Sequence, residues 1–257
     1  MSTAREIAEW MKDRVAEARS GGIVVGLSGG IDSAVVIGLA ALAVPDRVVG
    51  VIMPCHSDPT DEDHARLVAD QFGVPTLRVD LSAAYDRLLA DLSTATARLP
   101  QELRPAVLVD TEDPRQQLPH ANVKPRLRMT TLYFVANGLN YLVAGTGNRC
   151  ELTIGYFTKY GDGGVDMLPL GRLLKSQVRD IARQIGVPAA VIEKPPTAGL
   201  WTGQTDEGEM GFTYAELERY LTQGPATVSP ALGLRIERLA RGSDHKRALP
   251  PMPPEDG

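Results

Sequence analysis

The sequence predicts an α/β fold, a parallel sheet flanked by helices. Short apolar runs, typical of buried strands, alternate along the chain with segments of helical periodicity. Such alternation favours parallel strands joined by right-handed helical crossovers. The first run, Ile23–Val25, passes through a glycine-rich turn directly into a helical segment, which is the junction where open α/β sheets bind ligands. The 257 residues suffice for one such core, and we expect a single domain over 1–257.

The expected elements follow from periodicity and from capping residues. Ala4–Ala18 has apolar residues at helical spacing and is followed by a glycine pair. Thr60 is expected to be the N-cap of a helix that has acids in its first turn and ends at Gly73. The other expected strands are Val48–Met53, Thr76–Val79 and Asn140–Ala144. The other expected helices are Ser33–Ala43, Ser82–Leu92, Ala121–Gly138 with an interruption near Pro125, Leu173–Ile185, Tyr214–Leu221 and Ser229–Arg241.

Three stretches lack such periodicity. Residues 93–120 are rich in proline, acids and glutamine, apart from one apolar run at 106–109, and we expect a mobile segment there. Residues 195–211 are expected to form a loop. The tail after Ala248, rich in proline and acids, is expected to be loose.

The overall composition excludes several classes of protein. The net charge of −5 gives no global positive field for nucleic acid. No apolar run is long enough to span a bilayer, and residues 1–19 are amphipathic with mixed charge, unlike a signal peptide. Cys55 and Cys150 lie far apart and outside any CxxC motif, which fits a reducing compartment. We therefore expect a cytoplasmic protein with no nucleic-acid or membrane partner.

The glycine-rich turn has the composition of a phosphate-binding loop. Unpaired N–H groups and the positive dipole end at a helix start hold an anion, and glycines at 29 and 30 permit positive φ. The lysine of a Walker loop and the third glycine of the dinucleotide fingerprint are both missing. Asp32 puts a carboxylate beside the phosphates, where a bound cation makes it useful. The turn comprises Gly26, Leu27, Ser28, Gly29, Gly30, Ile31, Asp32 and Ser33.

Two further stretches carry chemistry. The loop 145–151 also follows an expected strand, and its Glu151 could face Asp32 across the sheet edge. Two carboxylates, phosphate oxygens and water make a Mg²⁺ site, although a glycine turn with a solvated glutamate is the alternative. Residues 155–166 combine aromatic rings, a cation and acids, which suits a heteroaromatic ring beside anionic groups. An ordinary flexible loop is the alternative there.

The glycine loop resembles the SGGxDS signature of the N-type ATP pyrophosphatases, enzymes that split ATP into AMP and pyrophosphate. The strings at 157–162 (FTKYGD) and 194–196 (KPP) are more specific, and with them nearly the whole chain, except about 93–120, resembles NAD synthetase. The resemblance implies the adenine-nucleotide α-hydrolase-like form of the doubly wound fold. It also implies the short, ammonia-using type of enzyme and a homodimer.

The resemblance further implies an activity. Deamido-NAD is adenylated by ATP, with Mg²⁺ as cofactor and loss of pyrophosphate, and ammonia then displaces AMP to give NAD. Two alternatives stay open. One is another reaction of the superfamily, such as tRNA thiolation or GMP synthesis, although thiolation calls for sulfur-handling cysteines and a basic surface. The other is a non-catalytic nucleotide sensor, which could dispense with the metal-binding acids.

Site residues are implied position by position. Residues 26–33 would bind the ATP phosphates, Asp32 and Glu151 would hold Mg²⁺, and Lys175 would counter charge at the α-phosphate. These three would be the catalytic residues. Thr146, Lys175 and Thr197 would contact ATP. Phe157 would pack against the nicotinate ring. Deamido-NAD would be held by Arg126, Lys159, Asp166, His245 and Lys246, some of them reaching across the dimer interface.

Overall fold

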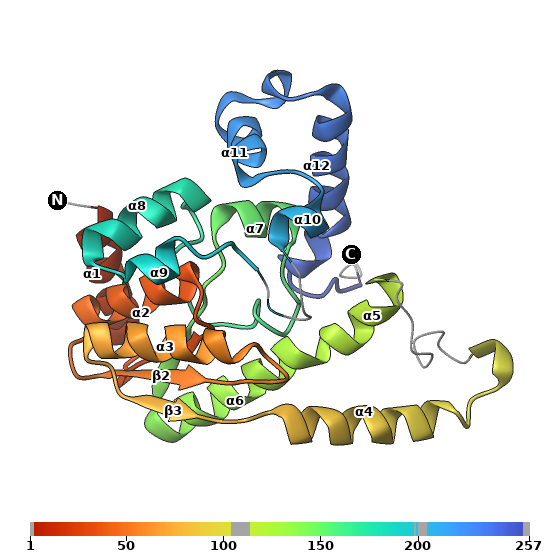
Figure 1. The fold of residues 1–257 in the computed structure, drawn as a ribbon, viewed down its shortest axis with the longest axis horizontal. Coiled ribbons are helices and arrows are strands. Elements are labelled where there is room, and N and C mark those ends of the chain that lie inside the picture. Colours follow the sequence, from red (N-terminus) through yellow and green to blue (C-terminus); the bar gives the residue numbers. More distant parts are fainter. Residues whose placement is uncertain (1–2, 104–113, 198, 200–204, 254–257) are drawn as a thin grey trace.

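The computed structural model describes residues 3–103, 114–197, 199 and 205–253. At its centre lies a four-stranded sheet in which every pairing is parallel, in the order β3-β2-β1-β4 (Figure 1). The predicted fold class and strand regions are therefore confirmed. The strands are β1 (Gly22–Leu27), β2 (Val48–Ile52), β3 (Thr76–Arg78) and β4 (Tyr141–Ala144).

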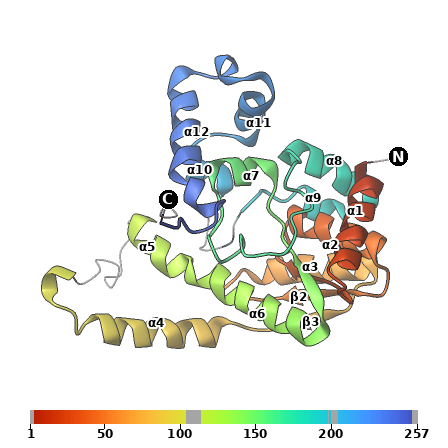
Figure 2. The ribbon, with the colours of Figure 1, turned by 180° about the vertical axis from the view of Figure 1, so that it is seen from behind.

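Helices cover both faces of the sheet, as Figure 2 also shows from behind. In β1, Ile23 and Val25 point to one apolar layer and Val24 to the other, and all three are fully buried. Burial on both faces explains why this strand reads as an unbroken apolar run. One face carries α1 (Thr3–Glu17), α2 (Ile31–Ala43), α3 (Pro59–Phe72), α8 (Lys175–Ile185) and α9 (Ala189–Ile192); the other carries α6 (Val123–Leu139) and the start of α4 (Ser82–Thr96).

A second group of helices stands beyond the sheet and packs around its own apolar cluster, which includes Cys150, Leu217 and Ile236. Both cysteines of the chain are free and buried. No helix in the described ranges is long and apolar enough to cross a bilayer. The group consists of α7 (Arg149–Ile154), α10 (Asp206–Met210), α11 (Tyr214–Gln223) and α12 (Pro230–Gly242), with 3-10 turns at Pro225–Thr227 and Asp244–Lys246.

The predicted N-cap at Thr60 is wrong. Asp58 caps α3, because its carboxylate accepts a hydrogen bond of 2.9 Å from the Thr60 N–H. Pro59 then takes the first helical position, where its missing N–H and fixed φ cost nothing. The predicted end at Gly73 is confirmed, since that residue has φ of 63° and closes the helix in the left-handed conformation.

Helices extend into two stretches that the sequence predicts to be irregular, 93–120 and 195–211, the second of which contains α10. Within 93–120, α4 continues to Thr96, a 3-10 turn spans Gln101–Leu103 and α5 covers Pro114–Ala121. The apolar run at 106–109 lies outside the described residues, and the mobility of the segment stays a prediction. The break near Pro125 falls instead at Asn122, because a proline in the first turn of α6 interrupts no helical hydrogen bond.

Candidate active site

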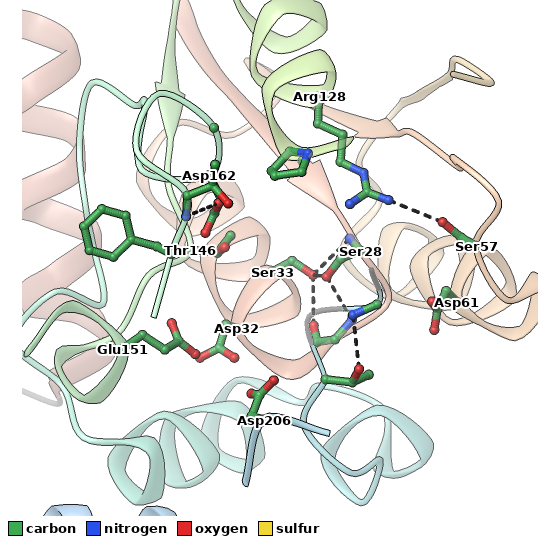
Figure 3. Close-up of a pocket in the computed structure, with 18 of the residues that line it drawn as sticks. Ser28, Asp32, Ser33, Ser57, Asp61, Arg128, Thr146, Glu151, Asp162 and Asp206 are labelled. Carbon is green, nitrogen blue, oxygen red and sulfur yellow. Dashed lines mark hydrogen bonds between the residues drawn. The ribbon is translucent and has the colours of Figure 1, made fainter. Parts of the chain in front are cut away.

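A cavity of about 790 Å³ lies at the carboxyl ends of β1, β2 and β4 (Figure 3). This is the edge at which the glycine loop and the loop before α7 both emerge. Ten of the residues predicted to bind ATP line it, together with Glu151, which is predicted to bind metal, and Phe157. Those ten are Gly26, Leu27, Ser28, Gly30, Ile31, Asp32, Ser33, Thr146, Lys175 and Thr197.

The glycine loop is held by its own serines and by a close contact with α3. Gly29 has φ of 75°, and a Cβ built on it would lie 2.2 Å from the Asp61 carbonyl oxygen. Gly30 does not have the positive φ expected of it. It is the N-cap of α2 in an extended conformation, with φ of −96°. No side chain caps α2 there, so N–H groups of its first turn remain available to an anion. The Ser28 and Ser33 hydroxyls lie 3.1 Å apart and brace the turn.

Gly29→Ala is expected to destroy nucleotide binding. The alanine would need a disfavoured φ, and its methyl would collide with backbone rather than with a side chain that could move. We expect a destabilisation of about 2 kcal/mol or more. Chemical denaturation and ATP calorimetry check this. Gly242→Ala is the matched control, because nothing lies within 4 Å of its Cβ position and its φ is not positive. Unchanged ATP binding in Gly29→Ala would contradict the assigned geometry.

Asp32 and Glu151 share one cationic neighbour, the ammonium group of Lys175. Figure 3 shows that their two carboxylates lie next to each other. The Lys175 ammonium lies 2.5 Å from Asp32 Oδ2 and 3.6 Å from Glu151 Oε1. Asn148 fixes both acids, because its amide donates to Asp32 Oδ1 at 3.1 Å and its carbonyl accepts from the Glu151 N–H. Glu151 in turn accepts from the Asn148 N–H at 3.1 Å, which completes a capping box at the start of α7. The structure therefore brings the two acids together, and their role as metal ligands remains a prediction.

The charges of this cluster are out of balance. Burial, and then the neighbouring Asp32 carboxylate, raise the pKa of Glu151 to about 8. Lys175 is only 2% exposed, and burial alone would lower its pKa, but the two carboxylates raise it above its usual value. Burial also raises the pKa of Asp206, which accepts a hydrogen bond of 2.8 Å from the Tyr214 hydroxyl. With Asp32, Glu151 and Asp206 all ionised, the site would hold more negative charge than its lysine compensates.

The donor chemistry of this cluster fits Mg²⁺. Asp32 and Glu151 supply hard carboxylate oxygens at the cavity wall, and the raised pKa of Glu151 shows that further positive charge would be favourable there. Within the described ranges, no group of three or more His, Cys, Asp or Glu side chains could hold a metal ion. Water and substrate oxygens would have to complete the coordination, which is the usual arrangement for Mg²⁺ beside phosphates.

The residues predicted to bind deamido-NAD do not gather in this cavity. Lys246 lines it and donates to the carbonyls of Gly155 and Phe157, each at 2.8 Å. Lys159 lies outside the residues that line the cavity. Its backbone carbonyl accepts a hydrogen bond from the Arg126 guanidinium at 3.4 Å, and its ammonium donates one to the His245 carbonyl at 2.5 Å.

Asp166 is also outside the lining. Its carboxylate accepts hydrogen bonds from the Val143 N–H at 2.8 Å and from the Tyr133 hydroxyl at 2.9 Å. Because Val143 belongs to β4, Asp166 attaches its own segment of the chain to that strand. The roles of these five residues in substrate binding remain predictions.

Several residues of the site were missed in the sequence. Asn148 could have been found, because an asparagine three positions before a glutamate is a capping-box signal. Asp206 starts α10, which lies in the stretch wrongly predicted to be all loop. Tyr156 lies in the stretch 155–166 that its aromatic rings singled out, but no role was predicted for its hydroxyl, which donates to Glu209 at 2.7 Å. Arg128, which points into the cavity from α6, had no signal of spacing or composition.

Comparisons with known proteins show which proteins this chain resembles. The family model described as NAD synthase matches residues 3–250. The NH(3)-dependent NAD(+) synthetase of Carboxydothermus hydrogenoformans is 48% identical over 248 residues, which cover 96% of this chain and 95% of that protein. The protein of the same name from Syntrophomonas wolfei is 42% identical, covering 97% and 95%.

Two solved structures are also similar. The NMN synthetase of Francisella tularensis has a TM-score of 0.86 and 35% identity, covering 98% of this chain and 97% of that one. The NAD+ synthetase of Burkholderia pseudomallei has a TM-score of 0.75 and 31% identity, covering 96% and 90%.

Proposed function

Because the chain belongs to the NAD synthase family, we propose that it makes NAD from deamido-NAD and ammonia with ATP as co-substrate. The enzyme is a ligase that forms a carbon–nitrogen bond. The nicotinate carboxylate attacks the α-phosphorus of ATP and pyrophosphate leaves. Ammonia then attacks the acyl carbon of the adenylate, AMP leaves and the added nitrogen loses a proton. A carboxylate is a poor acyl donor, so adenylation supplies the leaving group that amide formation needs.

In this proposal the residues of the cavity position charge rather than form covalent bonds. The glycine loop and the free N–H groups of α2 bind phosphate oxygens, and Thr146 and Thr197 contact ATP. Asp32 and Glu151 hold Mg²⁺, which neutralises charge on the departing pyrophosphate when it is bound. Lys175 orients both carboxylates and counters charge at the α-phosphate. The observation that carries these assignments is the Asp32–Lys175–Glu151 cluster beside an uncapped helix start.

The direct test is a product assay. Purified protein is incubated with deamido-NAD, ATP, Mg²⁺ and ammonium, and the expected products are NAD, AMP and pyrophosphate in equal amounts. Formation of ADP, or no NAD, would contradict the proposal. The cluster also argues against a nucleotide sensor, which would leave ATP unchanged during a long incubation with the other substrates.

A second candidate substrate is nicotinate mononucleotide, because a structural neighbour at 35% identity is an NMN synthetase. Both substrates carry the same nicotinate carboxylate and differ in the adenylate half. Competition between the two in one reaction, with NAD and NMN measured together, gives the ratio of their kcat/KM values. A ratio in favour of deamido-NAD is expected from the 48% and 42% identical relatives.

Mg²⁺ binding without nucleotide is expected to tighten as pH rises. With a pKa of about 8, Glu151 is largely protonated at pH 6.5, so the ion must displace a proton there but not at pH 9. We expect the affinity to rise about 30-fold over this interval. Calorimetry at several pH values checks this, with the exposed-face variant Glu237→Gln as control. Glu151→Gln is expected to bind weakly with no such slope. An equal slope in that variant would assign the proton to another group.

We also propose a homodimer. The α4 and α6 helices carry exposed apolar side chains, including Leu92 at 44% and Phe134 at 80% exposure. Four of the five residues assigned to deamido-NAD lie outside the cavity of this chain, which fits a substrate that is held partly by a partner. Light scattering after gel filtration tests this, and Phe134→Asp is expected to weaken the dimer. A cytoplasmic location fits the two buried free thiols.

A further inference from the structure

Arg128 is a cation of the cavity wall that has no acidic partner. It lies on the face of α6 that lines the cavity, whereas Arg126 is exposed. Its Nε donates to the Met53 carbonyl at 3.2 Å and its Nη2 to the Ser57 hydroxyl at 3.3 Å. Among the residues that the structure describes, no carboxylate lies within 4.0 Å of its guanidinium, and Nη1 makes no hydrogen bond.

The contrast with Lys175 makes this position unusual. Lys175 is held by two carboxylates, at 2.5 and 3.6 Å. Both acceptors of Arg128 are neutral oxygens, and burial lowers the pKa of this half-buried guanidinium with only partial compensation from Cys55, Asp162 and Asp61. Taking a charge out of water without an opposite charge nearby is unfavourable. Such a cation is favourable where a ligand brings the missing negative charge.

The surroundings indicate the kind of ligand. Met53 and Ser57 belong to the segment after β2, next to the glycine loop, and Figure 3 shows the guanidinium between Ser57 and the loop at Ser28. A guanidinium presents donors in a planar fork that matches two phosphate oxygens, and the free Nη1 leaves part of that fork unused.

We propose that Arg128 binds a phosphate group of a nucleotide substrate in the cavity, through Nη1 and its neighbouring donor. The inference rests on the proposed function, in which both ATP and deamido-NAD carry phosphates. Arg128 is then a substrate-binding residue additional to those that the family resemblance implies. The two sources of phosphate are distinguished by measuring each substrate alone, which also prevents turnover.

The test measures binding by calorimetry for wild type, Arg128→Met and Arg128→Lys. The probes are ATP, adenosine, deamido-NAD and nicotinate riboside, each without the second substrate. For one of the two nucleotides, we expect Kd to rise about 10- to 100-fold in Arg128→Met, as for loss of a charge-assisted hydrogen bond. Arg128→Lys is expected to lie between. The phosphate-free probe of the same half should bind all three proteins equally, and the nucleotide affected identifies the source.

Control measurements separate this role from a structural one. Arg241→Met removes an arginine that is 81% exposed and should change no Kd. Arg128→Met should unfold at the same denaturant concentration as wild type or a higher one, since it removes an uncompensated charge. Unchanged Kd values for both nucleotides, or equal losses for a nucleotide and its phosphate-free probe, would overturn the proposal. Failure of the proposed function is seen separately, as wild-type protein that binds nucleotides but forms no NAD.

Discussion

Lys175→Met is expected to cost about 3–5 kcal/mol of unfolding free energy, because it leaves two carboxylates without their cation. The ammonium is almost fully buried, and it lies within 4 Å of both the Asp32 and the Glu151 carboxylates. The loss should be larger at pH 9 than at pH 5. With the cation gone, the folded-state pKa of Glu151 rises further above its ordinary value, so the native protein binds more protons than the unfolded chain and loses stability as pH rises. Urea denaturation at the two pH values checks this.

The matched control lies on the same helix. Arg183 pairs with Asp180 at 2.9 Å on the exposed face of α8, and Arg183→Met should change stability by no more than about 0.5 kcal/mol. The triple variant Lys175→Met/Asp32→Asn/Glu151→Gln should recover most of the loss, since amides need no cation. Its NAD formation should remain absent. Full stability of the single variant at pH 9 would show that another group neutralises the acids.

Asp32→Ala is expected to lower NAD formation by at least about 10³-fold while weakening adenosine binding little. The carboxylate lies at the start of α2 beside the glycine loop, and its role in the proposed reaction is to hold Mg²⁺ for pyrophosphate departure. The fold should persist, because Lys175 keeps Glu151 as a partner at 3.6 Å. Steady-state rates and adenosine calorimetry together check this.

Two further measurements make this result specific. Removing the Asp32 charge should lower the pKa of Glu151 from about 8, because repulsion between the two carboxylates contributes to it. A shift of the pH dependence of Mg²⁺ binding to lower pH would report this. Asp180→Asn on the exposed face of α8 is the control for rate. An active Asp32→Ala enzyme would contradict the assigned metal site.

Local sequence patterns predict the strands and the long helices correctly but miss the short helices α7 and α10. The buried runs of β1 and β2 and the glycine at the end of α3 are strong signals, because period and capping chemistry act within a few residues. The N-cap of α3 was misplaced by two positions, since Asp58 and Thr60 are both good caps and only the Pro59 backbone decides between them. The short helices α7 and α10 are held by the α11 and α12 helices that pack on them.

The sequence by itself determined the parallel α/β fold and the presence of two acids after two strands that end at the same sheet edge. These follow from periodicity and from the rule that parallel strands place their carboxyl ends together. Only the tertiary structure decided that Lys175 lies between those acids, that Asn148 fixes both, and that Arg128 rather than Arg126 faces the cavity. Such choices depend on side-chain direction and on desolvation by distant segments, which no local pattern of residues encodes.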